Sequence, residues 1–275
     1  MRMNSAAGPS SLFARLRRVI SRSPVGRGWR RSSDLDLWQR SLGFAALGIL
    51  TLVPLLIIVS SADPEHGRGF AQWLGEGLGV STAAREQVEQ LFTPPGQALR
   101  TTTAFGIVAL AVFGLTFGAA VQTGYEVVWD LPPGRWWARW RHVVWLAMLT
   151  GYLFVSATTT LRRESPAGAF AASLSAVLFF WWSQRMLLGG RVRWRALLPG
   201  AVATVIGLLG LRVFSLLVFS PLIASNAVTY GSFGTVLVLQ SWLVGVGVVV
   251  FGGAMVGRLL HEELPRVAHA MRRRG

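Results

Sequence analysis

Residues 234–257 read GTVLVLQSWLVGVGVVVFGGAMVG, a stretch of 24 residues without a charged side chain. A helix of about 20 apolar residues crosses the hydrocarbon core of a bilayer, where backbone polar groups find partners only within such a helix. Five further long apolar stretches precede it, at residues 41–62, 104–126, 142–161, 167–188 and 197–219. The sequence therefore predicts an all-α fold, a polytopic bundle of six transmembrane helices.

The arginines predict the orientation of this bundle. All 27 basic residues of the chain are arginine, and 21 of them lie in residues 1–40, 127–141, 185–195 and 258–275. The alternate gaps hold five, and the last, Arg212, lies inside the fifth stretch. Because cytoplasmic loops retain basic residues, we expect both termini to be cytoplasmic. The chain then divides into a basic leader at 1–33, partly amphipathic or disordered, a membrane domain at 34–262 and a basic tail at 263–275.

Composition and charge limit the class of protein and its partners. Hydrophobic residues make up 52% of the chain and charged residues 14%, which excludes a soluble globular protein. The formal net charge of +15 favours anionic lipid headgroups as partners. A nucleic-acid partner is the alternative. However, the preference for basic residues in cytoplasmic loops already accounts for these arginines, and the short basic segments contain no recognisable RNA-binding or DNA-binding module with interleaved aromatic residues. We therefore expect membrane lipids and no nucleic acid as partners, while the oligomeric state stays open.

The titratable residues form no pattern that predicts an enzyme. The absence of cysteine removes thiolate catalysis and cysteine zinc motifs. The run from His261 to Glu263 resembles part of a zinc-protease helix, but the second histidine is missing and Pro265 interrupts the turn. We expect no catalytic residues, no metal site, no cofactor and no ATP hydrolysis.

Arg212 is the outlier among the membrane-embedded residues. It lies about 10 Å from the outer edge of its stretch at the rise of an α-helix, and Gln240, next to Ser241, reaches a similar depth on the returning helix. Pro54 bends the first helix nearby. A guanidinium at this depth suits a lipid phosphate or the carboxylate or phosphate of a solute. The alternative is that Arg212 snorkels to outer headgroups or bonds helix-end carbonyls.

Four segments together resemble the YihY/BrkB family of bacterial inner-membrane proteins, once mislabelled as ribonuclease BN. They are FAALGILTLVPLL at 44–56, QTGYEVVWDLPPGR at 122–135, RWRALLPGA at 193–201 and NAVTYGSFGTVLVLQSWL at 226–243. The resemblance extends over residues 34–262 and implies six helices with both ends cytoplasmic in a bacterial inner membrane. Relatives usually carry glutamate after a glycine and an alanine in the sixth helix, whereas Met255 follows Gly253 and Ala254 here.

Two functions from different classes follow. The first is a transporter or lipid-handling protein for an anionic or amphiphilic solute, with a site formed by Arg212, Gln240, Ser241 and Pro54. The alternative is a structural envelope membrane protein or scaffold, in which Arg212 serves as a packing or lipid contact. A ribonuclease ranks behind both, because neither soluble face carries an acid, base or metal cluster.

Overall fold

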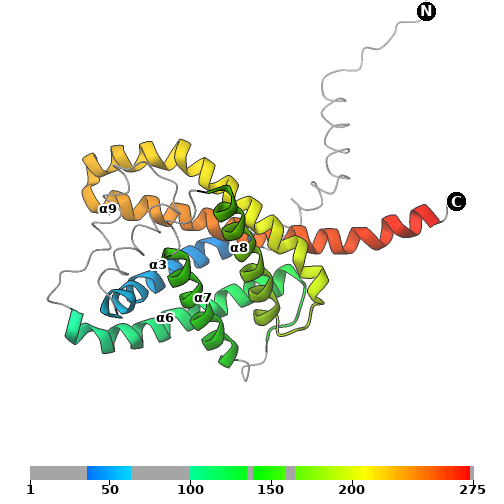
Figure 1. The fold of residues 1–275 in the computed structure, drawn as a ribbon, viewed down its shortest axis with the longest axis horizontal. Helices are drawn as coiled ribbons and strands as arrows, with labels where there is room; N and C mark the ends of the chain where they lie inside the picture. The colour runs from blue at the N-terminus through cyan, green and yellow to red at the C-terminus, as the bar shows by residue number, and fades with distance from the viewer. Residues whose placement is uncertain (1–35, 63–98, 135–138, 159–164, 273–275) are drawn as a thin grey trace, which may run out of the picture.

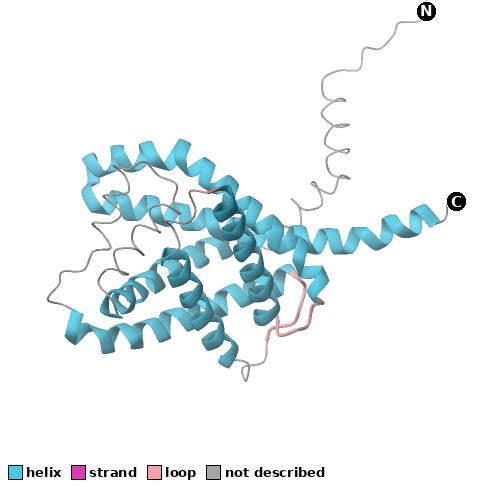
Figure 2. Cartoon of the chain, in the orientation of Figure 1, coloured by secondary structure: helices cyan, strands magenta, loops and turns pink. Residues whose placement is uncertain are grey.

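The computed structural model describes residues 36–62, 99–134, 139–158 and 165–272, and within them the regular elements are all α-helices (Figure 2). They are α3 (Leu37–Ala62), α6 (Leu99–Val128), α7 (Trp140–Thr158), α8 (Pro166–Leu187) and α9 (Trp194–Arg272). The predicted all-α fold is thus confirmed for this part of the chain. The predicted leader at 1–33 lies outside the described residues.

Helix α9 contains two of the predicted stretches and folds back on itself (Figure 1). Its first arm, Trp194–Val218, and its second arm, Val236–Glu262, run antiparallel in contact. A Cβ on Gly207 would lie 2.6 Å from Val249, and one on Gly257 would lie 2.8 Å from the Cα of Gly200. Residues without side chains let helices approach this closely.

Four segments of the described chain are long and apolar enough to cross a membrane. They are Gly106–Val128 of α6, Pro166–Leu187 of α8 and the two arms of α9. The remaining predicted stretches fall on α3 and α7, which join the same bundle: α3 packs against α6 and α9, and α7 packs against α6 and α8. Helix α3 continues through Pro54, whose side chain is buried.

The core is an aromatic cluster shared by α3, α6, α7 and the second arm. The ring of Phe44 lies 4.9 Å from that of Phe117 and 5.9 Å from that of Phe251. Trp145 continues the cluster from Phe117 at 5.8 Å, and Tyr125 continues it from Phe251 at 6.0 Å. Edge and tilted ring contacts of this kind stabilise a core beyond the burial of area.

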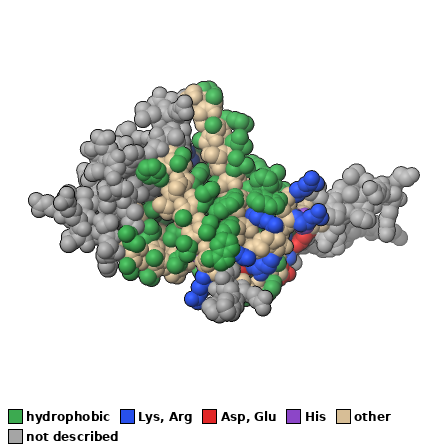
Figure 3. Space-filling model, turned by 60° about the horizontal axis from the view of Figure 1, so that its bottom comes forward, with side chains coloured by type: hydrophobic (Ala, Val, Ile, Leu, Met, Phe, Trp, Pro, Cys, Tyr) green, Lys and Arg blue, Asp and Glu red, His purple; other side chains and the backbone are tan. Residues whose placement is uncertain are grey.

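The outer surface of the bundle is largely apolar. Large hydrophobic side chains on α8 and the first arm are well exposed, among them Phe170 at 71%, Ile206 at 63% and Leu217 at 73%. Figure 3 shows hydrophobic side chains over the body of the molecule and arginines gathered towards one end. An apolar surface of this extent requires an apolar environment, which a bilayer provides.

Candidate functional site

Six arginines lie at one end of the bundle, which we call the basic end: Arg141, Arg185, Arg191, Arg193, Arg195 and Arg258. Two connections meet there: residues 129–134 after α6 and residues 188–193 between α8 and α9. The start of α7 and residues 258–262 of α9 complete it. Four helix ends and the second arm of α9 therefore bring together charged residues that are distant in the sequence.

Both connections begin with a turn in the left-handed region. After α6, Asp130 has φ of 55°, the Leu131 amide donates to the Glu126 carbonyl at 2.8 Å, and the Asp130 amide donates to Val127 at 3.1 Å. After α8, Gly189 and Gly190 have φ of 64° and 76° and donate in the same pattern. Each is a Schellman ending, which satisfies helix carbonyls and turns the chain sharply.

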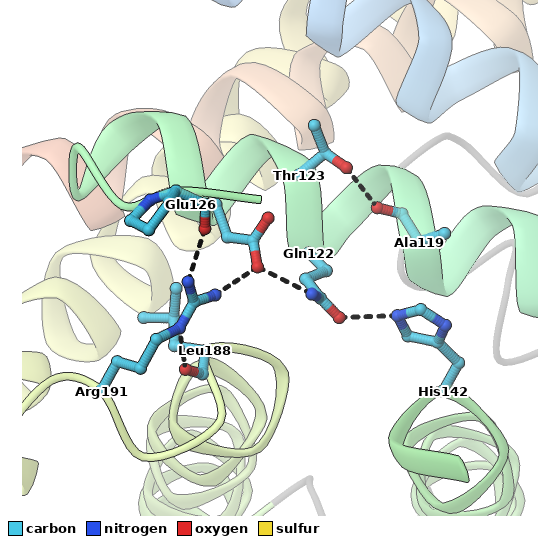
Figure 4. Close-up of polar contacts among 8 residues, drawn as sticks. Ala119, Gln122, Thr123, Glu126, His142, Leu188 and Arg191 are labelled. Atoms are coloured by element: carbon cyan, nitrogen blue, oxygen red, sulfur yellow. Dashed lines mark hydrogen bonds and ion pairs between the residues drawn. The ribbon is translucent and has the colours of Figure 1, made fainter. Parts of the chain in front are cut away.

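A partly buried salt bridge joins the last turn of α6 to the connection after α8 (Figure 4). The side chain of Glu126 is only 5% exposed, and its Oε1 accepts from Nη2 of Arg191. Both connections hold Arg191 in this direction, because its Nε donates to the Leu188 carbonyl at 2.9 Å and its Nη1 to the Pro132 carbonyl at 2.5 Å. The guanidinium thus connects α6, the loop after it and the end of α8.

Hydrogen bonds extend this salt bridge along α6 to α7. Gln122, one turn before Glu126, donates from Nε2 to Oε1 of Glu126 at 2.7 Å. Its own Oε1 lies 2.7 Å from Nε2 of His142, which must donate because an amide oxygen only accepts. A Cβ on Gly134 would lie 2.8 Å from the Glu126 carboxylate, so the loop covers the pair closely. We call Gln122, Glu126, His142 and Arg191 the polar cluster.

Arg258 attaches the second arm of α9 to the end of α6. Its Nη1 donates to the carbonyl of Val128 at 2.7 Å, a helix-end carbonyl that the Schellman ending leaves open. Its Nε donates to Glu262 at 2.7 Å, and its Nη2 lies 3.4 Å from Oδ2 of Asp130. The side chain is 11% exposed, so this guanidinium is a structural cap.

The residues predicted from the sequence as an anion site lie elsewhere. Arg212 is exposed on the first arm, Gln240 is half-buried on the second, and Ser241 is exposed and donates to the Leu237 carbonyl at 2.9 Å. Gly245 lies level with Leu211, since a Cβ there would be 3.0 Å from that leucine. This register separates Arg212 from Gln240 by about 6 Å along the helix axis.

The structure therefore does not bring Arg212 and Gln240 to one depth, and the Arg212 side chain faces outwards. Pro54 is buried in α3, away from that surface. Anion binding by these residues stays a prediction. The environment of Arg212 is nevertheless distinctive, because the residues around it on the same surface are apolar: Leu209 is 50% exposed, Val213 59% and Leu216 52%.

The polar cluster was missed by reasoning from the sequence, which placed no carboxylate deep in a helix. Glu126 is the last residue of the predicted second stretch, and it is buried by the loop that follows it. A signal was present in the spacing of Gln122 and Glu126, which puts both side chains on one face of a helix. From the sequence, its partner Arg191 is one of the arginines that predict a cytoplasmic loop, and nothing there indicates a salt bridge.

Comparisons with known proteins agree with the membrane fold. The sequence profile of the family described as "Virulence factor BrkB" matches residues 29–274. A "UPF0761 membrane protein" of Chromobacterium violaceum is 25% identical over 249 residues, which is 82% of this chain and 59% of the relative. The chain thus spans less than two thirds of the length of that relative. No solved structure matches it.

Proposed function

Since the chain belongs to the BrkB family of membrane proteins, we propose that it binds and moves an anionic amphiphile, with a phospholipid as the solute, in a bacterial inner membrane. The observation that carries this proposal is the exposed position of Arg212. Movement of the solute would be driven by a gradient or be passive, since the chain carries no phosphate-binding loop for ATP.

Arg212 lies on a surface that hydrocarbon would otherwise cover. It is seven residues from the end of the predicted stretch at residue 219, which places it about 10 Å inside the bilayer edge. A charged side chain facing lipid costs at least about 2.5 kcal/mol near the bilayer centre, so the guanidinium requires an anionic partner or a path to the headgroups. No described residue pairs with Arg212. A lipid phosphate is a suitable anionic partner, because it accepts two parallel hydrogen bonds from the guanidinium fork.

The proposed topology has six crossings and both termini in the cytoplasm. It is supported by the four membrane-spanning segments, by α3 and α7 in the same bundle, and by the gathering of arginines at one end. Arginine-rich ends of membrane proteins face the cytoplasm. The exposed Arg193 and Arg195 would then contact acidic headgroups of the inner leaflet.

We also propose that the protein is not an enzyme and has no nucleic-acid partner. The buried ionic groups of the basic end are already engaged with one another: Glu126 with Arg191, and Arg258 with Glu262. These pairs leave little capacity for general acid or base chemistry there. Within the described residues, no group of three histidine or acidic side chains could hold a metal ion.

A structural role without transport is the second candidate, and the close contact of the two arms of α9 favours it. A Cβ on Gly253 would lie 2.8 Å from the backbone nitrogen of Thr204, and Gly257 is equally close to Gly200. Backbones in contact make a rigid hairpin, which suits a scaffold as well as the fixed part of a transporter.

The two candidates are separated by phospholipid movement in vesicles. Purified protein is reconstituted with a trace of phosphatidylglycerol carrying a fluorophore on its headgroup side, and dithionite reports how much of the label reaches the outer leaflet. We expect movement above that of protein-free vesicles for the wild type, a weaker rate for Arg212→Lys and no rate above background for Arg212→Leu.

Arg193→Leu is the matched control, because it removes the same charge from an exposed arginine at the other end of the first arm. It should retain the movement of phospholipid. If wild-type protein moves no more lipid than empty vesicles, and native mass spectrometry finds phosphatidylglycerol bound equally to wild type and Arg212→Leu, the scaffold is the better description.

A further inference from the structure

The contact between α8 and α9 contains a polar side chain that the polar cluster does not use. Gln184 of α8 is fully buried at 0% exposure. Neither its Oε1 nor its Nε2 has a hydrogen-bond partner among the described residues. A primary amide offers two donors and an acceptor, and burying it without partners is unfavourable.

The amide faces the point where α8 meets both arms of α9. A Cβ on Gly200 of the first arm would lie 3.4 Å from Oε1 of Gln184 and 3.3 Å from the carbonyl oxygen of Gly253 on the second arm. Thr204, also fully buried, lies against Gly253 and donates its hydroxyl to the Gly200 carbonyl at 2.9 Å. We call Gln184, Gly200, Thr204 and Gly253 the α8–α9 seam.

Two features of the α8–α9 seam favour a bound polar group. On its α9 side, Gly200 and Gly253 have no side chains, so the backbone of both arms lies close to the amide. Its polar atoms come from all three helical segments, and buried water molecules in proteins typically make two to four hydrogen bonds to such groups. Buried polar side chains in native proteins almost always have a partner in protein or water.

We propose that the α8–α9 seam is a water-accessible binding site in which Gln184 hydrogen-bonds the polar headgroup of the amphiphile, with water in its place when the amphiphile is absent. This inference rests on the proposed function, and it adds a contact for the headgroup inside the bundle. The headgroup chemistry is that of a hydroxyl or phosphate oxygen, because a hydroxyl can donate to Oε1 and accept from Nε2, and an ionised phosphate oxygen can accept from Nε2. Arg212 on the outer surface and Gln184 in the interior are then separate contacts of one solute.

The absence of cysteine from the chain makes the seam directly testable. Gln184→Cys and Leu187→Cys place a thiol at two positions of α8 that are both 0% exposed and lie about one turn apart. A thiol reacts with a hydrophilic maleimide only as the thiolate, which forms where water reaches it. In lipid nanodiscs we expect the Gln184→Cys variant to be labelled at least about 10-fold faster than the Leu187→Cys variant.

The same preparation tests the solute. Lysophosphatidylglycerol below its micellar concentration should slow the labelling of Gln184→Cys and leave that of Arg193→Cys, at an exposed position, unchanged. Labelling of Gln184→Cys as slow as that of Leu187→Cys would overturn the inference, and so would labelling that the lysolipid does not slow.

Thermal unfolding of Gln184→Leu gives a second measurement that needs no thiol. A dry, unpaired amide predicts a higher midpoint for this variant, since an apolar side chain is better tolerated there. A hydrated amide predicts no gain, so a higher midpoint contradicts the inference. The two proposals can fail separately: a dry seam in a protein that moves phospholipid overturns only this inference. If the lysolipid slows the labelling of Gln184→Cys but the protein moves no phospholipid, only the proposed function is overturned.

Discussion

Neutralising Glu126 should destabilise the bundle through Arg191. The Glu126→Gln variant keeps the size of the side chain and an oxygen for the Gln122 amide, but it leaves the guanidinium without its anion. Breaking a fully buried pair costs about 3–5 kcal/mol. The side chain of Arg191 is 29% exposed, so water screens part of this cost, and we expect a loss of roughly 2 kcal/mol.

Removing the cation should cost more than removing the anion. Arg191→Met leaves a carboxylate that is 5% exposed with Gln122 as its remaining partner among the described residues, and it also gives up the hydrogen bonds to the carbonyls of Pro132 and Leu188. We expect a loss of about 3–4 kcal/mol. The double variant should be less destabilised than the sum of the two single variants by about 1–2 kcal/mol, since the residues interact directly.

Equilibrium unfolding in mixed detergent micelles measures all three variants. Arg195→Gln is the control, because Arg195 is an exposed arginine of the same basic end, and it should stay within about 0.5 kcal/mol of the wild type. A Glu126→Gln variant as stable as this control, or a double variant whose loss equals the sum of the single losses, would refute the salt bridge as a stabilising contact.

Three further predictions concern topology, partners and the contact between the arms of α9. In intact cells an impermeant maleimide should label Ser81→Cys but not Ser32→Cys; both positions lie outside the described residues, and the opposite pattern would reverse the proposed orientation. In neutral nanodiscs the protein should bind structured RNA only with a steep dependence on salt, whereas metal-dependent cleavage lost in His261→Ala would reveal an enzyme. Gly253→Ala should lower stability by about 1–3 kcal/mol through overlap with the first arm, while Gly252→Ala, which meets nothing within 4 Å, should stabilise the helix slightly, as thermal unfolding can check.

Long apolar stretches sufficed to predict the helices and the all-α class, because a membrane-spanning helix satisfies its backbone within one continuous segment. The stretches at 197–219 and 234–257 both fall within α9, and the arginines of the basic end come from three of the four segments predicted on one side of the membrane. The family resemblance carried by four segments was confirmed by the match over residues 29–274.

The rotation of each helix about its axis and the pairing of its ends were decided only by the tertiary structure. A helix that is apolar on most sides gives no signal of which side faces lipid, so the outward direction of Arg212 could not be read from its position. Contacts between distant residues are equally invisible: Glu126 meets Arg191 across 65 positions, and Arg258 meets the Val128 carbonyl across 130. These contacts depend on which helix ends come together when the bundle packs, and local hydropathy holds no information on that arrangement.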